Sequence, residues 1–225
     1  GVGLELPKLD EANLSTLASN EVSKTTKIVL FSALVDSTDS RGVFKSMSPK
    51  LPPIGVLSMA STLKANGYTN VEFIDIDCEK RSFDEIAKDL ACDPPGLIGV
   101  SIYTNMYFST RERIAGLKRY LPDTPIVTGG PHAILEGLRI IQETEADFVC
   151  TGEGEFFIVE LLEALSGRKE FITIKGLIYR DENNKIVEND PRDLQDDLDV
   201  FPMPNYDLTK RYLHDYRPVP ILFKN

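Results

Sequence analysis

The stretch Ile126-Val127-Thr128-Gly129-Gly130-Pro131-His132 decides how this chain folds. Its apolar beginning is typical of a short buried strand, and the proline after the two glycines suits the first position of a helix. Because glycine has no side chain, a large ligand can approach the backbone of the pair closely. The N–H groups at the start of a helix lack intrahelical partners and favour an anionic group. We therefore expect this stretch to form one lip of a binding site.

Outward from this stretch, the sequence repeats the same pattern of a strand followed by a helix. Apolar runs predict strands at residues 27–32, 71–76, 96–101, 125–128 and 147–151. Periodicity, capping residues and prolines predict helices at residues 53–67, 82–93, 108–121, 131–141 and 154–167. These units predict an α/β fold: a doubly wound, Rossmann-like parallel five-stranded sheet in the order 2-1-3-4-5, with helices on both faces.

Particular residues predict where the helices begin and which faces they bury. Ser82 and Glu85 have the spacing of a capping box, in which each side chain accepts from the backbone of the other residue. Phe108 is expected on the inward face of the third helix, and Leu135 and Leu138 on that of the fourth.

The two ends of the chain lack the repeated strand–helix pattern of the middle. Residues 1–26 are polar and weakly patterned, and we expect them to lead into a domain at residues 27–170. In residues 171–225, apolar runs on either side of Asp181–Asn184 predict a C-terminal β-hairpin, followed by an acidic, proline-containing linker. The apolar segment Val219–Phe223 is expected to enter a further domain of a longer protein.

Composition and charge disfavour several classes of partner. The 225 residues are 42% hydrophobic, and their formal net charge of −10 repels nucleic acid and anionic membranes. No apolar run approaches the roughly 18–20 residues that span a bilayer, and residues 1–27 lack the layout of a signal peptide. We therefore expect a cytoplasmic protein without nucleic-acid or membrane partners.

Cysteine and histidine are too few and too scattered to predict a metal centre. Cys78, Cys92 and Cys150 match no zinc or iron–sulfur spacing and are interpreted as buried or half-buried thiols. His132 and His214 are the two histidines of the chain. We therefore expect neither metal ligands nor catalytic residues in this chain.

Two other families with five strand–helix units fit the sequence less well. A receiver domain needs an aspartate at the end of the third strand, where this chain has Ser101-Ile102-Tyr103. A flavodoxin needs a phosphate loop that runs directly into a helix, whereas more than ten residues separate Ser40 from Pro53. Phosphoryl transfer is therefore disfavoured, while a flavodoxin-like module for FMN stays open as an alternative.

Several short motifs, taken together, resemble one known family. Ser101 and the Gly129–Gly130 pair have the spacing of the S-x-L…GG pattern of cobalamin-binding domains, with Tyr103 in place of leucine. The more specific motifs are Pro52-Pro53-Ile54-Gly55, Gly129-Gly130-Pro131-His132-Ala133, Thr151-Gly152-Glu153-Gly154-Glu155 and the stretch from Asp199 to Asp207. Over residues 27–225 the chain resembles the N-terminal B12-binding domain of cobalamin-dependent radical S-adenosylmethionine (radical SAM) enzymes.

This resemblance implies a function and a set of site residues. The domain would bind base-off cobalamin, and the remainder of the polypeptide, a C-terminal radical SAM domain, would hold a [4Fe–4S] cluster and S-adenosylmethionine. The implied cofactor-binding residues are Ser101, Tyr103, Thr104, Gly129, Gly130, Pro131, His132, Gly152 and Glu153. For each there is a structural alternative, since hydroxyls cap helices, glycine pairs form tight turns and acidic residues favour helix N-termini.

The chain departs from the family pattern at two places. Residues 33–51 contain no histidine, so the D-x-H-x-x-G motif that supplies a cobalt ligand is missing, as in many members of the radical branch. His132 is expected to make hydrogen bonds at a helix start rather than to bind cobalt. The C-x-x-x-C-x-x-C motif is also missing, so this chain should be inactive alone, although the intact protein resembles a methyltransferase or related radical enzyme. A cobalamin-free scaffold or docking domain is a further alternative.

Overall fold

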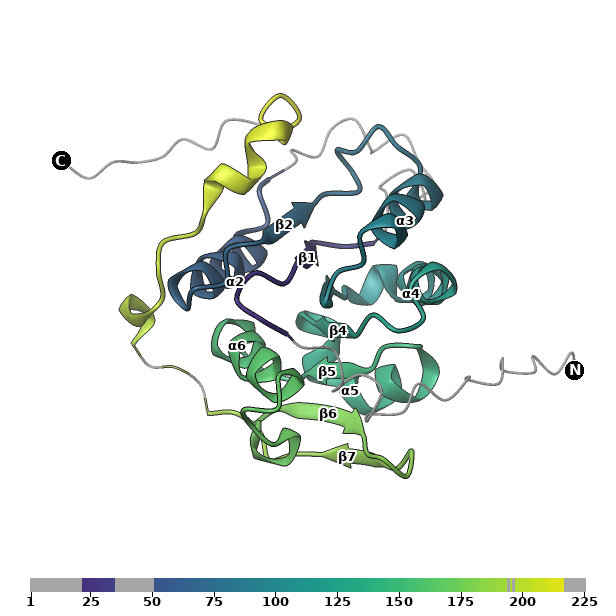
Figure 1. Ribbon diagram of the computed structural model, residues 1–225, viewed down its shortest axis with the longest axis vertical. Coiled ribbons are helices and arrows are strands. Elements are labelled where there is room, and N and C mark those ends of the chain that lie inside the picture. The colour runs from purple at the N-terminus through teal and green to yellow at the C-terminus, as the bar shows by residue number, and fades with distance from the viewer. Residues whose placement is uncertain (1–21, 35–50, 194, 196, 217–225) are drawn as a thin grey trace, which may run out of the picture.

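The computed structural model describes residues 22–34, 51–193, 195 and 197–216, and its centre is one seven-stranded sheet (Figure 1). The strands are β1 (Ile28–Phe31), β2 (Val71–Ile74), β3 (Leu97–Ser101), β4 (Ile126–Gly129), β5 (Phe148–Cys150), β6 (Leu177–Arg180) and β7 (Ile186–Glu188). Their order is β2-β1-β3-β4-β5-β6-β7, parallel from β1 to β5 and antiparallel beyond. The order 2-1-3-4-5 expected from the sequence is thus confirmed.

The predicted hairpin is confirmed, and it extends the same sheet. β6 pairs with β5 in an antiparallel register, with Phe148 opposite Tyr179 and Cys150 opposite Leu177. The domain boundary expected at residue 170 stays a prediction. The expectations for residues 1–21, for the loop at 35–50 and for Val219–Phe223 lie outside the described residues.

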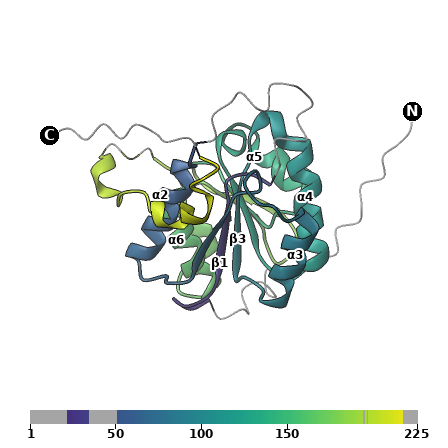
Figure 2. The same ribbon diagram turned by 90° about the horizontal axis from the view of Figure 1, so that it is seen from above.

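Helices cover both faces of the sheet (Figure 2). The helices are α2 (Ile54–Ala65), α3 (Phe83–Cys92), α4 (Tyr107–Tyr120), α5 (Pro131–Glu143) and α6 (Gly154–Leu165). The pair α2 and α6 packs on one face, and α3, α4 and α5 pack on the other. The strands of the parallel part therefore lie between two layers of helices, which explains the continuous apolar runs in most of them.

The capping signals of the sequence are present in the structure. The Ser82 hydroxyl accepts from the Glu85 N–H group, and the Glu85 carboxylate accepts from the Ser82 N–H group, so the predicted capping box is confirmed. Gly67 and Gly167 follow the ends of α2 and α6 with φ of +88° and +74°, values that favour glycine.

The expected inward faces of α4 and α5 were partly wrong. Leu135 and Leu138 are exposed, because α5 leaves helical geometry at Glu136 and buries a different set of residues. Gly137 faces the sheet instead, and a Cβ there would lie 2.7 Å from Cγ2 of Thr151. Phe108 is also exposed.

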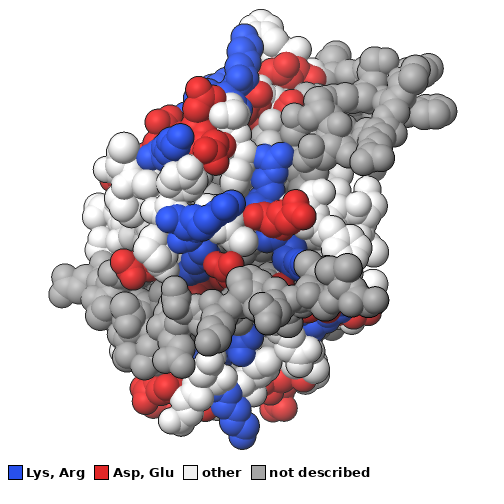
Figure 3. All heavy atoms as spheres, turned by 90° about the vertical axis from the view of Figure 1, so that its right-hand side faces the viewer, with Lys and Arg blue, Asp and Glu red and all other residues white. Residues whose placement is uncertain are grey.

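The mixed charge of one outer face is visible in Figure 3, on the side of the molecule that carries α3, α4 and α5. Lys and Arg side chains are interspersed there with Asp and Glu. Some of these side chains form ion pairs within a single helix, Arg139 with Glu143 in α5 and Lys88 with Asp84 in α3.

The chain after β7 returns along the α2 side of the molecule to the edge of β2 (Figure 1). We call residues 199–216 the C-terminal strap. Ser61 on α2 donates to the Met203 carbonyl at 2.8 Å, and Tyr212 and Tyr216 are buried. The acidic linker expected from the sequence is therefore packed against the domain in its second half.

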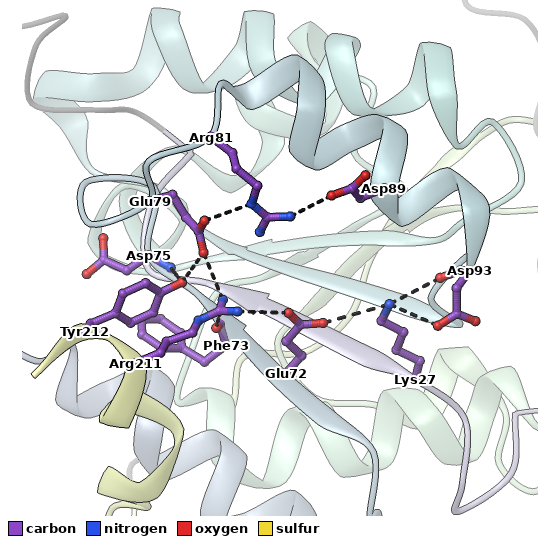
Figure 4. A network of polar contacts seen from close by, with 10 residues as sticks. All are labelled: Lys27, Glu72, Phe73, Asp75, Glu79, Arg81, Asp89, Asp93, Arg211 and Tyr212. Atoms are coloured by element: carbon purple, nitrogen blue, oxygen red, sulfur yellow. Dashed lines mark hydrogen bonds and ion pairs between the residues drawn. The ribbon is translucent and has the colours of Figure 1, made fainter.

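The strap ends in a network of polar contacts with β2 and the loop that follows it (Figure 4). The Arg211 guanidinium donates to the Phe73 carbonyl at 2.8 Å and lies 3.2 Å from the Glu79 carboxylate. The Tyr212 hydroxyl donates to Glu79 at 2.6 Å and accepts from the Asp75 N–H group at 3.2 Å. The strap therefore bonds to backbone groups at the edge of the sheet.

Candidate functional site

A pocket of about 270 Å³ opens at the carboxyl edge of the parallel strands. It extends between the sheet and the helices α2 and α6, where β1, β3 and β4 supply the floor. Its walls include residues from α2 and α6 that were not among the nine expected cofactor-binding residues, namely Val56, Met59, Glu155, Phe157 and Ile158. This is the edge at which doubly wound sheets bind their ligands.

A glycine in the middle of β3 lies on the floor of the pocket. Gly99 pairs with Leu30 on β1 and with Val127 on β4, so the three residues form one row across the floor. A Cβ on Gly99 would lie 2.8 Å from Cδ2 of Leu30, 3.9 Å from Cγ1 of Val127 and 4.0 Å from Cδ1 of Ile158. We call the space between Leu30, Gly99, Val127, Phe157 and Ile158 the slot.

The glycine pair forms the lip of this pocket, as expected from the opening stretch. Gly129 pairs with Ser101 at the ends of β4 and β3, and its carbonyl accepts from the Ile102 N–H group at 2.8 Å. Gly130 has a φ of +93°, and a Cβ on it would lie 3.2 Å from the Ile102 carbonyl oxygen. Backbone conformation and close approach therefore both favour glycine at this position.

The structure brings together six of the nine residues expected from the sequence. The pocket is lined by Ser101, Tyr103, Gly129, Gly130, Pro131 and Gly152. Thr104, His132 and Glu153 do not line it. The binding role of all nine residues stays a prediction.

His132 is held within the fold at the start of α5. Its side chain is 5% exposed, and its Nδ1 lies 3.2 Å from Oγ1 of Thr104. Its ring packs against the ring of Tyr107, with centroids 4.8 Å apart. The Tyr107 hydroxyl donates to Glu143 at 2.8 Å, and burial together with this hydrogen bond raises the pKa of Tyr107 to about 12.

Glu153 and Glu155 are directed to different partners. The Glu153 carboxylate accepts from the Gln195 N–H group at 3.2 Å, which links α6 to the chain beyond β7. Glu155, two residues further along the chain, lines the pocket. Of the two acidic residues in this motif, Glu155 is the better placed to meet a ligand.

The cysteines fit the interpretation of buried thiols in two of three cases. Cys78 and Cys150 are buried, and Cys92 is exposed. Cys150 lines the pocket, and its thiol donates to the Gly152 carbonyl at 3.4 Å. Burial raises the pKa of the Cys150 thiol to about 12, so this group is a neutral thiol at pH 7.

Within the described residues, no group of three or more His, Cys, Asp and Glu side chains is arranged to hold a metal ion. The helices in that part of the chain are also too short or too polar to cross a membrane.

The slot was missed by the sequence reasoning, although one signal pointed to it. Glycine weakens a strand interior and often marks a place where another group approaches the backbone closely. Gly99 is such a glycine, inside the apolar run Leu97–Ser101. The residues opposite it come from distant parts of the chain, so sequence spacing alone does not bring them together.

Comparison with known sequences gives a family match and several relatives. Residues 40–162 match the B12 binding domain family. The chain is 32% identical over 158 residues to an uncharacterized methyltransferase of Pyrococcus horikoshii, covering 70% of this chain and 34% of that protein. It is 28% identical over 152 residues to the anaerobic magnesium-protoporphyrin IX monomethyl ester cyclase of Rubrivivax gelatinosus, covering 66% and 27%. The chain thus spans about a third or less of the length of these relatives.

Solved structures share the fold. The cobalamin-dependent S-adenosylmethionine radical enzyme OxsB, with aqua-cobalamin and S-adenosylmethionine bound, superposes with a TM-score of 0.58 at 19% identity over 76% of this chain and 23% of that one. The radical S-adenosylmethionine methyltransferase TsrM from Kitasatospora setae, with cobalamin and a [4Fe-4S] cluster bound, gives 0.61 at 19% identity over 80% and 31%. The family match covers more than half of the chain, from the loop after β1 to α6. The chain therefore belongs to the B12-binding domain family.

Proposed function

We propose that this chain binds cobalamin in a base-off form, with the nucleotide tail of the cofactor held in the slot. The observation that carries this proposal is the apolar inner lining of the pocket at the carboxyl edge of the sheet, which Leu30, Gly99, Val127, Phe157 and Ile158 supply. The slot is apolar and suits an aromatic base removed from water. The lip at Gly129 and Gly130 gives the cofactor access to the backbone at the pocket mouth.

The polar groups near the mouth suit the rest of the cofactor. Ser101 and Glu155 line the pocket close to its opening and offer a hydroxyl and a carboxylate to the amide groups of a corrin ring. The Ser101 hydroxyl makes no hydrogen bond to another described residue. Ser101 is thus a candidate donor to the ligand.

We further propose that no histidine of this chain binds cobalt. His132 is engaged with Thr104 and Tyr107 and does not line the pocket. His214 lies in the C-terminal strap, and residues 33–51 contain no histidine. The protein would supply binding and orientation, while bound cobalamin would supply a cobalt centre that can carry a methyl group.

The activity proposed for the intact protein lies beyond this chain. The match covers 34% of one relative, a methyltransferase, and 27% of another, a cyclase. We propose a radical SAM enzyme, a methyltransferase or a related radical enzyme, in which a C-terminal radical SAM domain holds a [4Fe–4S] cluster and S-adenosylmethionine. This chain alone would be inactive. Its cytoplasmic location and its lack of nucleic-acid and membrane partners stay predictions.

One binding experiment tests the proposal. Purified protein is mixed with hydroxocobalamin, free ligand is removed by gel filtration, and the visible spectrum of the protein fraction is recorded. We expect retained corrinoid absorbance of the base-off type, with the same spectrum in a His132→Ala variant. Absence of corrinoid absorbance would contradict the proposal and favour a cobalamin-free docking domain. A parallel sample with FMN that retains yellow flavin would favour the flavodoxin-like alternative.

A further inference from the structure

The polar groups of the pocket lie at its mouth, and its interior is apolar. Ser101 follows Gly99 by two residues on β3 and so lies about 6–7 Å nearer the carboxyl edge, at roughly 3.3 Å per residue. Glu155 is in the first turn of α6, whereas Phe157 and Ile158 lie deeper along that helix. The five residues of the slot carry no side-chain nitrogen or oxygen.

The backbone around the slot offers a buried ligand few partners. Leu30, Gly99 and Val127 belong to three adjacent strands of a parallel ladder, in which N–H and C=O groups bond to neighbouring strands. Gly99 is paired on both sides, with β1 and with β4. A polar atom pushed between these strands and α6 would therefore find its possible partners already engaged.

The nearest polar side chains are also engaged or face away. Thr128 follows Val127 and points to the opposite face of the sheet, where its hydroxyl donates to the Phe148 carbonyl at 3.4 Å. The Cys150 thiol donates to the Gly152 carbonyl. Within the slot itself, no described side chain would therefore serve an amino group or a purine ring nitrogen; the Ser101 hydroxyl lies at the mouth, about 6–7 Å further along β3.

Building on the function proposed above, we propose that the slot discriminates between cobamides by their lower base. Cobamides share the corrin ring and the nucleotide tail and differ in the base at the end of that tail. The slot favours a benzimidazole, whose methyl groups and carbon edge match its apolar walls. It disfavours an adenine base, whose amino group and additional ring nitrogens would be buried without hydrogen-bond partners.

The size of the effect follows from the cost of an unpaired polar group. Leaving one polar group buried without a partner weakens binding by about tenfold or more, which corresponds to about 1.4 kcal/mol per factor of ten. The extra carbon surface of a dimethylated base adds to the difference in the same direction.

The test compares three ligands on the purified 225-residue protein: cobalamin, the corresponding adenine-base cobamide, and cobinamide, which lacks the nucleotide tail. Dissociation constants are measured by titration calorimetry or by the change in visible absorbance. We expect cobalamin to bind at least about tenfold more tightly than the adenine-base cobamide. Equal affinities of these two ligands would overturn base discrimination while leaving cobalamin binding intact. Failure of all three to bind would overturn the proposed function itself.

A pair of matched variants locates the discrimination in the slot. Val127→Thr places a hydroxyl in the slot and should reduce the preference for cobalamin several-fold by giving the adenine base a partner. Val149→Thr makes the same change in a fully buried valine that faces α5, on the other side of the sheet, and should leave the preference unchanged. If Val127→Thr behaves like Val149→Thr in a folded protein, the slot is not where the base is distinguished. The comparison of ligands on the unaltered protein tests the proposal independently of both variants.

Discussion

Cδ2 of Leu30 lies 2.8 Å from the position that a Cβ on Gly99 would occupy. The two residues are partners on the neighbouring strands β1 and β3, and both line the pocket. The Leu30 side chain therefore packs into the room that a side chain on residue 99 would need. Any larger residue at this place would either fill the slot or push Leu30 into it.

The first prediction concerns Gly99→Val. We expect this substitution to weaken cobalamin binding by at least about tenfold, because the slot loses the volume in which the base would lie. Overpacking should also lower the free energy of unfolding by about 1–3 kcal/mol. Titration with cobalamin measures the first effect and urea denaturation the second.

Cobinamide serves as the control ligand for this variant. Since it carries no base, the ratio of cobalamin to cobinamide affinity should fall in Gly99→Val. An unchanged ratio would show that the base does not occupy the slot.

The second prediction concerns the lip. Gly130→Ala should lower the free energy of unfolding by about 1–2 kcal/mol, because φ is +93° and the new Cβ would lie 3.2 Å from the Ile102 carbonyl oxygen. Gly55→Ala is the matched control, since a Cβ on Gly55 has nothing within 4 Å and alanine favours the helix. Chemical denaturation of both variants separates the two cases, and equal stabilities would contradict the strained turn.

The third prediction concerns alkaline pH. Burial, as the largest cause, raises the pKa of Tyr107 in the folded state to about 12, above the ordinary value of 10.0 that applies to the unfolded chain. A raised pKa means that the folded state holds the proton more tightly. Its contribution to stability is therefore complete below pH 10 and is lost as the pH rises from about 10 to about 12.

Tyr107→Phe removes this dependence. Denaturation curves between pH 9 and pH 12 should show a stability that falls less steeply in the variant than in the unaltered protein. Parallel curves over the whole range would show that Tyr107 titrates normally.

The fourth prediction concerns the thiols. At pH 7.5, iodoacetamide should modify Cys92, which is exposed, and spare Cys150, which is buried with a pKa of about 12. Peptide mass spectrometry of the native protein reads out each cysteine, and all three should react after unfolding in guanidinium chloride. Rapid modification of Cys150 in the native protein would show that its thiol is accessible from the pocket.

The fifth prediction concerns the C-terminal strap. Arg211→Ala should lower the free energy of unfolding by about 1 kcal/mol or more, because it removes the hydrogen bond to the Phe73 carbonyl and the ion pair with Glu79. Lys210→Ala is the control, since Lys210 pairs with Asp207 where both side chains are about 70% exposed. Similar thermal midpoints for the two variants would mean that the strap adds little to stability.

Much of the fold could be predicted because its local signals agree with its tertiary structure. The strand Ile28–Phe31 is buried on both faces, so its apolar run is unambiguous. The capping box of Ser82 and Glu85 depends on two residues close in sequence, and the glycine–proline pair at the start of α5 is a local turn signal. Such features are encoded over a few residues and need no distant partner.

The remaining features depend on contacts between distant segments. The kink at Glu136 changes which side of α5 faces the sheet, so Gly137 is buried and Leu135 is exposed. The slot is formed by three strands and α6, and residue spacing along the chain does not predict that these segments are adjacent. Glu153 was expected to contact the cofactor because of its motif, and its bond from the Gln195 N–H group, a partner distant in sequence, could not be foreseen.

The strap also affects whether the edge strand β2 is available to other copies of the protein. β2 is the outermost strand on its side of the sheet. Two backbone groups at this edge are the Phe73 carbonyl, in β2, and the Asp75 N–H group, directly after it. A free strand edge recruits strands from other chains and so seeds aggregation. Arg211 and Tyr212 bond to these groups in place of another strand, so neither group is free to pair with a strand of a second copy while the strap is docked.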